Sequence, residues 1–527
     1  MSINSIAFLI FLLISVLSYY AVPRRGRWVV LLFAGAFFYL SYSLRASVYL
    51  GVTILLTYGA GRWLGSMNRR QKDEAEGLSR REKAEVKKRW TRQKRRVLAA
   101  ALLVNFLTLA VFKYFDAWFE TLNRILALIS ADFSFRPLNL LLPLGISFYI
   151  FQTSGYLIDI YRGREQEERN FFRYALFASY FPQMIQGPIN RYGDLGRQLK
   201  QEHTFRAENI RDGIQLMIWG MLKKTFIADT LAPGVSEIYS NYGNYSGAVV
   251  FFGAVLYCLQ LYCDFSGGID IVRGASNLFG IRMAENFRRP YFAASIDEFW
   301  RRWHISLGEW MKDYLFYPLA LSKWMTKLGK RVRAVFGDRV GKLTAPCGAT
   351  VIVFLAVGIW QGPGLSNVAY GLWNGCLMSA AMFFAPQLRR INSALRLNTE
   401  SRGIHAFRVV RTCILVAAGR YFSGAASLTA ALGMIKQTVT AFTWNLSPAE
   451  FLSFGLAPRD YLVAAAASFV LFFVSLQQER GIRLREKLAE KPWFVQFVPV
   501  FLSLSLLTVC VWLNSDYTAI SYVYENV

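Results

Sequence analysis

Long apolar segments recur along the whole chain and are separated by short polar stretches. A membrane-spanning helix needs roughly 20 predominantly apolar residues. Segments of this kind lie near residues 5–22, 28–44, 48–65, 97–115, 138–160, 171–188, 210–230, 247–270, 347–361, 364–385, 412–433, 460–477 and 494–515. Some are short or interrupted by polar residues. The pattern therefore predicts an all-α, polytopic membrane protein with about eleven full spans, the remaining segments being re-entrant or interfacial.

The domain organisation follows from the spacing of these segments. No polar linker separates one apolar block from another, so we expect a single membrane domain over residues 1–527. Within it we distinguish N-terminal spans (1–66), a basic loop (67–96), a core rich in polar clusters (97–385) and C-terminal spans (386–527). Composition supports a membrane protein, because 54% of the residues are hydrophobic and 16% are aromatic.

The charge is strongly positive but uneven. The chain has a net charge of +26, which in a soluble protein would suggest a nucleic-acid partner. Here the basic residues gather in loops, most densely over residues 67–96. The positive-inside rule places that loop in the cytoplasm of a multi-pass protein of the cell membrane. Three preceding spans then put the N-terminus outside. We expect membrane lipid as a partner and no nucleic acid.

The segment "ASIDEFWRRWHISLGEWMKDYLFYPL" (294–319) has the densest candidate chemistry. Ser295 and Glu298 form a capping box, which predicts the start of a helix. Helical spacing would put His304 on one face with Trp300 and Trp303, away from most of the charges. His304 is either a packed histidine bonded to a backbone carbonyl or a base that works near neutral pH. The other histidines, His203 and His405, lie in polar loops.

A second cluster, "YCLQLYCDFSGGIDIVRG" (257–274), puts Asp264 and Asp270 in an apolar segment. Gly267 and Gly268 could break a helix there. The aspartates either line a cavity or pair with Arg273 or the arginines of residues 288–302. "YFPQMIQGPINRY" (180–192) has the composition of a broken helix. Lys223 and Lys224 could meet a phosphate or a carboxylate, but the pattern favours snorkelling to the interface.

Several motifs of soluble enzymes and metal sites are missing. The sequence has no P-loop, no G-x-S-x-G, no H-E-x-x-H and no C-x-x-C. We therefore expect no metal, and any chemistry must come from a few polar groups within the membrane domain.

"ENFRRPYFAASIDEFWRRWHISLGEWMKDYLFYPL" (285–319) resembles the signature of the membrane-bound O-acyltransferase family, on the bacterial branch that acylates extracellular polymers. "LPLGISFYIFQTSGYLIDIYRG", "FPQMIQGPINRY", "LKKTFIAD" and "YCDFSGGIDIVRGASNLFGIRM" match in order and spacing. The resemblance extends over residues 5–435 and implies a ring of helices with a thin centre. It also implies a cytoplasmic funnel for an acyl donor, either acetyl-CoA or an acyl carrier protein thioester, with no bound cofactor.

The resemblance also assigns site residues. His304 is the motif histidine. Gln361 occupies the position of the family's buried W-H-G histidine, and Asn374 that of a later histidine in some relatives. His304 and Gln361 are the candidate catalytic residues. The candidate residues that line the funnel or bind substrate are Asp264, Ser266, Arg301, Arg302, Trp303, Trp360, Asn374, Gln183 and Arg191.

Gln361 changes what chemistry is available. An amide does not accept a proton near pH 7, although it can orient a hydroxyl or donate to a developing oxyanion. One hypothesis is an acyltransferase that moves an acetyl or D-alanyl group from a cytoplasmic thioester to a hydroxyl of a cell-surface polysaccharide or teichoic-acid-like polymer, or to an extracellular acyltransferase- or esterase-like partner. The alternative is a non-catalytic homologue that acts as a scaffold or regulator of cell-surface acylation. A small-molecule transporter is disfavoured, since no symmetric pair of broken helices is present.

Overall fold

The computed structural model describes residues 3, 5–128, 133–137, 140, 142–443, 450, 452–509 and 522. This part of the chain contains helices and one isolated antiparallel bridge, between Phe287 and Trp303, but no strand. Two compact units emerge. Unit 1 comprises Met1–Met217, Ile271–Ala284 and Tyr524–Val527, and unit 2 comprises Ile218–Asp270 and Glu285–Val523.

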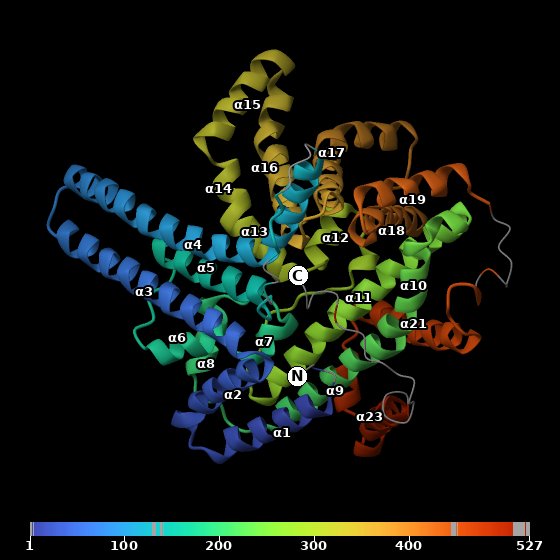
Figure 1. Cartoon of the computed structure of the whole chain (residues 1–527), viewed down its shortest axis with the longest axis horizontal. Coiled ribbons are helices and arrows are strands. Elements are labelled where there is room, and N and C mark those ends of the chain that lie inside the picture. Colours follow the sequence, from blue (N-terminus) through green and yellow to red (C-terminus); the bar gives the residue numbers. More distant parts are fainter. Residues whose placement is uncertain are drawn as a thin grey trace. The chain divides into compact units, whose positions relative to one another are not determined.

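Unit 1 is built from the N-terminal helices (Figure 1). They are α1 (Ile6–Ala21), α2 (Arg27–Tyr42), α3 (Leu44–Ala75), α4 (Arg80–Leu128), α5 (Ile146–Arg162), α6 (Phe171–Ala178), α7 (Phe181–Gln186), α8 (Arg197–Lys200) and most of α9 (Ala207–Lys223). Every residue of α5 from Ile146 to Ile160 is buried, and α5 packs against both α3 and α4. This helix therefore forms the core of unit 1.

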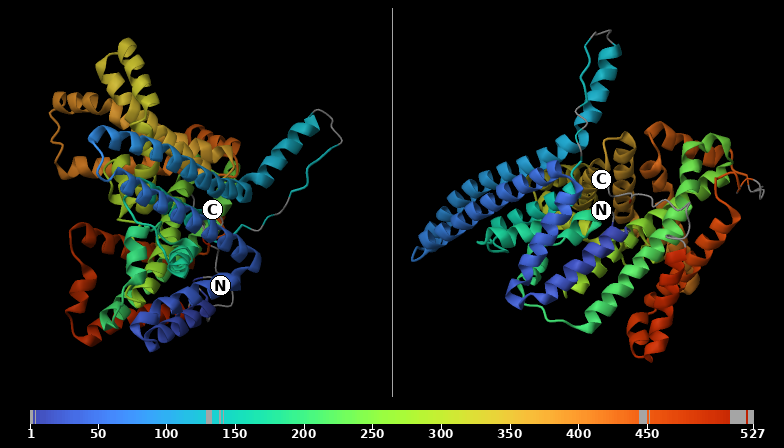
Figure 2. Two further views of the ribbon diagram at one scale, coloured as in Figure 1. Left: turned by 90° about the vertical axis from the view of Figure 1, so that its left-hand side faces the viewer. Right: turned by 60° about the horizontal axis from the view of Figure 1, so that its bottom comes forward.

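The basic segment 67–96, which we expected to be a loop, is mostly helical. It extends α3 to Ala75 and begins α4 at Arg80, and Figures 1 and 2 show the two helices side by side as a long hairpin. Its Lys, Arg, Glu, Gln and Ala residues are good helix formers. Ser79 and Glu82 form a reciprocal capping box, with Ser79 N donating to Glu82 Oε2 at 2.9 Å.

Unit 2 contains α10, most of α11 and the helices that follow α11 (Figure 1). They are α10 (Thr230–Ser240), α11 (Gly247–Leu278), α12 (Ile296–Arg302), α13 (Ile305–Met311), α14 (Tyr317–Ala320), α15 (Lys323–Phe336), α16 (Asp338–Gln361), α17 (Leu365–Ala394), α18 (Arg402–Gly424), α19 (Leu428–Thr440), α21 (Pro458–Glu479), α22 (Leu484–Ala489) and α23 (Trp493–Leu507). A π-helical turn, Lys224–Asp229, connects α9 to α10.

Five of the described helices are long and apolar enough to cross a membrane: α4, α11, α16, α17 and α21. The shorter α1 and α23 are also apolar. An all-α, multi-pass membrane protein is thus confirmed, whereas the count of about eleven spans stays a prediction. The expected spans at 138–160 and 494–515 lie partly outside the described residues.

Two local predictions are wrong, one at residues 171–188 and one at Gly267 and Gly268. Residues 171–188 form two short helices, α6 and α7, rather than one span. α11 continues through Gly267 and Gly268 without a break. A β-carbon at Gly267 would lie 2.8 Å from the carbonyl oxygen of Gly220 in α9, so glycine there permits close packing of the two helices rather than a break.

Candidate active site

His304 lies in a tight turn between α12 and α13, not within a continuous helix as its spacing predicted. The predicted helix start is confirmed, since Ser295 caps α12 by accepting from Glu298 N at 3.1 Å, but the return bond of a capping box is not formed, because the Glu298 carboxylate accepts from Ala294 N at 2.9 Å instead of Ser295 N. α12 then ends at Arg302, and His304 adopts a left-handed conformation with φ 47° and ψ 52°. A residue other than glycine rarely adopts this conformation, and it persists only where surrounding contacts impose it.

Asn286 supplies those contacts. Its carbonyl oxygen accepts from Ile305 N at 3.0 Å, and its side-chain Oδ1 accepts from Ser306 N at 3.0 Å and Ser306 Oγ at 2.6 Å. Two residues along, Arg288 N donates to Arg302 O at 2.9 Å. The segment that begins at the fully buried Asn286 therefore holds the backbone on both sides of His304.

The imidazole of His304 is enclosed by aromatic rings and is only 2% exposed. The Phe265 ring meets it edge-on at 4.8 Å between centroids, and the Trp360 ring lies at 6.2 Å. Burial lowers the pKa of His304 from 6.5 to about 3, because the charged form loses its hydration. The side chain is therefore a neutral imidazole, able to accept a proton, throughout the physiological pH range.

Trp360 and Gln361 reach the site at the end of α16. α16 and α17 approach closely, since a β-carbon at Gly358 would lie 2.3 Å from the Asn367 carbonyl oxygen. Trp360 is 5% exposed, and Gln361 is the last residue of the helix. The structure thus brings Trp360 against His304 and places Gln361 next to Trp360 along the chain.

Asn374 fastens the same helix pair to α12. Its Oδ1 accepts from Trp300 Nε1 at 3.3 Å, and its Nδ2 donates to Tyr370 O at 2.9 Å. The Trp300 ring also packs on Phe354 of α16 at 4.9 Å. Asn374 therefore holds α12 and α17 together within unit 2.

Comparison with known proteins identifies the family. The model of the membrane-bound O-acyltransferase family matches residues 162–336, which include the His304 turn. A probable alginate O-acetylase of Pseudomonas syringae pv. tomato is 30% identical over 91% of this chain and 84% of its own length.

The chain belongs to the membrane-bound O-acyltransferase family. It is an acyltransferase of the membrane. A peptidoglycan O-acetyltransferase of Helicobacter pylori is 31% identical over 57% of this chain and 58% of its own length. A teichoic acid D-alanyltransferase of Bacillus subtilis is 28% identical over 55% of this chain and 70% of its own length.

In this membrane-bound O-acyltransferase, Asp264 and Ser266 belong to a buried ionic cluster. Lys224 Nζ lies 2.6 Å from Asp264 Oδ1 and 2.8 Å from Asp229 Oδ1. Lys223 Nζ lies 2.8 Å from both Ser266 Oγ and Asp270 Oδ2. The geometry thus supports structural ion pairs, in which lysines are the partners of Asp264 and Asp270. The prediction that Lys223 and Lys224 reach the membrane interface is wrong, because they are only 4% and 1% exposed.

Arg301 and Arg302 have different environments. Arg302 pairs with Glu298 at 2.6 Å and with Glu479, at the end of α21, at 2.9 Å. Arg301 is largely exposed and pairs with Asp297 on its own helix. Arg302 therefore fastens α12 to α21, while Arg301 lies at the surface.

Gln183 and Arg191 lie in unit 1. The buried Gln183 side chain accepts from Gln152 Nε2 at 2.7 Å and donates to Phe177 O at 2.5 Å. Arg191 is half-buried and precedes the π-helical turn Tyr192–Gly196. The broken-helix prediction is confirmed here, because α7 ends at Gln186 and an extended segment follows.

Trp303 reveals a residue that the sequence analysis missed. It is 2% exposed and stacks on Phe299, with ring centroids 5.5 Å apart. The guanidinium of Arg420, from α18, lies over the Trp303 ring at 4.9 Å and also donates to Tyr370 Oη at 3.3 Å. Arg420 is only 2% exposed. An arginine in the apolar run 412–433 was the available signal, since charges there are costly and tend to be functional.

Proposed function

We propose that the chain transfers an acetyl group from a thioester donor to a hydroxyl group of a cell-surface polysaccharide or of an extracellular protein that passes it on. Support for acetyl comes from the relatives at 30% identity or more, which are named as O-acetylases or as an O-acetyltransferase. A D-alanyl group is the second candidate, because the chain also aligns with teichoic acid D-alanyltransferases at lower identity.

The observation that carries the proposal is the neutral, buried imidazole of His304 beside Trp360. In the proposed step, the hydroxyl oxygen attacks the thioester carbonyl carbon, His304 accepts the hydroxyl proton, and the C–S bond breaks. The proton then passes to the departing thiolate. An imidazole with a low pKa is a weak base before charge develops on the substrate. The negative charge that develops on the oxyanion and thiolate favours its protonated form during the reaction.

Gln361 is assigned a positioning role at the same site. Its amide is able to donate a hydrogen bond to the carbonyl oxygen of the thioester as negative charge develops there. It does not replace a base, so His304 is the single titratable group that the proposal uses.

The donor and the acceptor are placed on opposite sides of the membrane. We assign acetyl-CoA or an acyl carrier protein thioester to the cytoplasmic side, together with the basic ends of α3 and α4, because basic residues favour that side. The N-terminus is then outside. Crossing the membrane would be the reason for a polytopic rather than a soluble acyltransferase.

The test measures thioester consumption by the purified full chain in nanodiscs with acetyl-CoA. We expect turnover in the wild type and a loss of about 100-fold or more in His304→Ala, the range for removal of a general base. The control is His405→Ala, which changes an exposed histidine. Gln361→His, run beside these, tests whether a second imidazole raises the rate.

If the wild type consumes no thioester and Gln361→His does, the proposal is replaced by the alternative of a non-catalytic scaffold. Turnover that survives His304→Ala would remove His304 from the chemistry. Replacing acetyl-CoA by a D-alanyl carrier-protein thioester, in the same assay, decides between the two acyl groups.

A further inference from the structure

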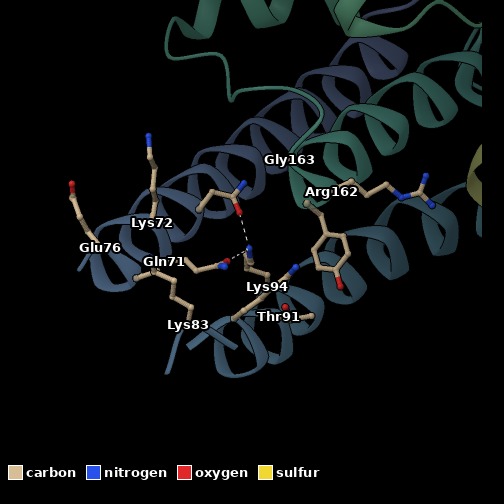
Figure 3. A pocket seen from close by; sticks show the side chains of 12 residues that line it. Gln71, Lys72, Glu76, Lys83, Thr91, Lys94, Arg162 and Gly163 are labelled. Atoms are coloured by element: carbon tan, nitrogen blue, oxygen red, sulfur yellow. Dashed lines mark hydrogen bonds between the residues drawn. The ribbon is translucent and has the colours of Figure 1, made fainter. Parts of the chain in front are cut away.

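Unit 1 contains a pocket that the proposed acyl transfer does not use. It has a volume of about 640 Å³ and lies between the polar ends of α3 and α4, beside the end of α5 (Figure 3). Five cationic side chains line it with one carboxylate; they are Lys72, Lys83, Lys87, Lys94, Arg162 and Glu76. This excess of positive charge indicates a site for an anion.

Lys94 is the inner residue of this group. It is 7% exposed, and its Nζ donates to Asn68 Oδ1 at 2.8 Å and to Gln71 Oε1 at 2.6 Å (Figure 3). Both partners are neutral amides. Within the part of the chain that the structure describes, Lys94 makes no ion pair with a carboxylate. An ammonium group has three donors, so one N–H is left for a ligand, and its buried charge favours an anionic one.

The nearby carboxylates do not neutralise the pocket. Glu74 binds Arg89 and accepts from Trp90 Nε1 at 2.8 Å. Glu167 lies among Arg62, Arg69 and Arg169. Arginines thus take up these acids, and the four pocket lysines make no ion pair among the described residues.

The position of Lys94 relative to the apolar part of α4 favours a membrane lipid as the source of the anion. The uncharged part of α4 begins at Val97, three residues after Lys94. At 1.5 Å per residue, Lys94 lies about 5 Å beyond the start of that apolar stretch. The headgroup layer occupies roughly the first 5–8 Å outside the hydrocarbon. Lys83 and Lys87 lie about 15–20 Å beyond it along the helix and line the outer part of the same pocket.

From this arrangement we propose that the pocket binds a phosphate ester, and that its source is the headgroup of an anionic membrane lipid. The phosphate contacts Lys94 at headgroup depth, while the outer lysines strengthen the attraction. Basic pockets of this kind on membrane helices recognise anionic lipids through the same combination of contact and field. The inference does not depend on the acyl-transfer reaction.

Native mass spectrometry of the delipidated full chain tests it. Phosphatidylglycerol is titrated against phosphatidylcholine, which has the same phosphate but no net charge. We expect preferential binding of phosphatidylglycerol, weakened about fivefold or more in Lys94→Met and two- to threefold in Lys83→Gln/Lys87→Gln. The matched control is Arg81→Gln/Lys88→Gln, which removes the same charge from exposed positions of α4 outside the pocket.

Three outcomes would overturn the proposal. They are equal binding of the two lipids, unchanged phosphatidylglycerol binding in Lys94→Met, and equal losses in the two double variants. If Lys94→Met does not fold, the exposed double variants still decide. Competition by inorganic phosphate, glycerol phosphate or coenzyme A at millimolar concentration would instead assign the pocket to a soluble phosphate ester, against the lipid source.

Discussion

Lys224 in unit 2 and Lys94 in unit 1 are both buried lysines, but their partners differ. Lys224 lies between the carboxylates of Asp264 and Asp229, whereas Lys94 is held by the amide oxygens of Asn68 and Gln71. The first cluster compensates its charge internally, and the second leaves a net positive charge in an open pocket. Burial alone therefore does not tell whether a lysine has a structural role or binds a ligand. The charge of the groups that contact the lysine does distinguish these roles.

The largest effect that this comparison predicts is on stability. Lys224→Met leaves two buried carboxylates without their cation and should destabilise the protein by about 3–5 kcal/mol. Lys94→Met leaves only neutral amides and should cost about 1 kcal/mol or less. Thermal unfolding in detergent, followed by circular dichroism, measures both. Similar losses in the two variants would contradict the distinction.

Asn286 provides a further contrast with the amides that hold Lys94. Both of its acceptor oxygens, the backbone carbonyl and the side-chain Oδ1, accept hydrogen bonds from the segment that follows His304. Asn286→Ala removes the side-chain contact to Ser306, loosens the His304 turn and should lower kcat about 10- to 100-fold, with KM nearly unchanged. Ser306→Ala should give a smaller loss, and the double variant less than the sum of the two. Steady-state kinetics with the acyl thioester measure these effects. Additive losses, or a change confined to KM, would exclude a positioning role for Asn286.

A smaller effect is expected from pH, because His304 carries no charge in the folded protein. Its pKa is about 3 when folded and about 6.5 when unfolded, so the unfolded chain binds more protons between these values. The contribution of His304 to the free energy of unfolding is thus fully present above pH 6.5 and decreases as the pH falls towards 3. At pH 5.5 the loss due to this residue is about 1 kcal/mol.

His304→Gln should therefore reduce the fall in Tm between pH 7.5 and pH 5.5. The exposed His405→Gln is the matched control and should leave that fall unchanged. An identical pH dependence in the wild type and His304→Gln would show that folding does not lower the pKa of His304.

The sequence predicted the all-helical membrane class, the Ser295 cap and a broken helix within residues 180–192, because these depend on residues close together in the chain. The turn at His304 was not predictable in this way. It is imposed by Asn286, eighteen residues earlier, and local spacing carries no signal for that pairing. Charge density predicts a loop at the end of α3 and the start of α4, whereas the helix propensity of the same residues agrees with the helices observed.

The partners of buried charged residues were also not predictable from the sequence. A lysine in an apolar run looks the same in sequence whether it reaches the interface, as expected for Lys224, or meets aspartates on another helix. Arg420 lies in a segment that contains no recognisable motif. Its place over Trp303 depends on α18 packing beside α12, which no local pattern specifies.

The left-handed turn at His304 has a consequence for how such a site could evolve. The hydrogen bonds that impose the turn come from the backbone of Arg288 and Ile305 and from Asn286 and Ser306, and none of these uses the imidazole. The shape of the loop is therefore inherited separately from the side chain that it presents. Asparagine and glycine, which tolerate this conformation well, could replace the histidine without rebuilding the loop. A lineage could thus lose or regain its reactive group by single substitutions on an unchanged scaffold.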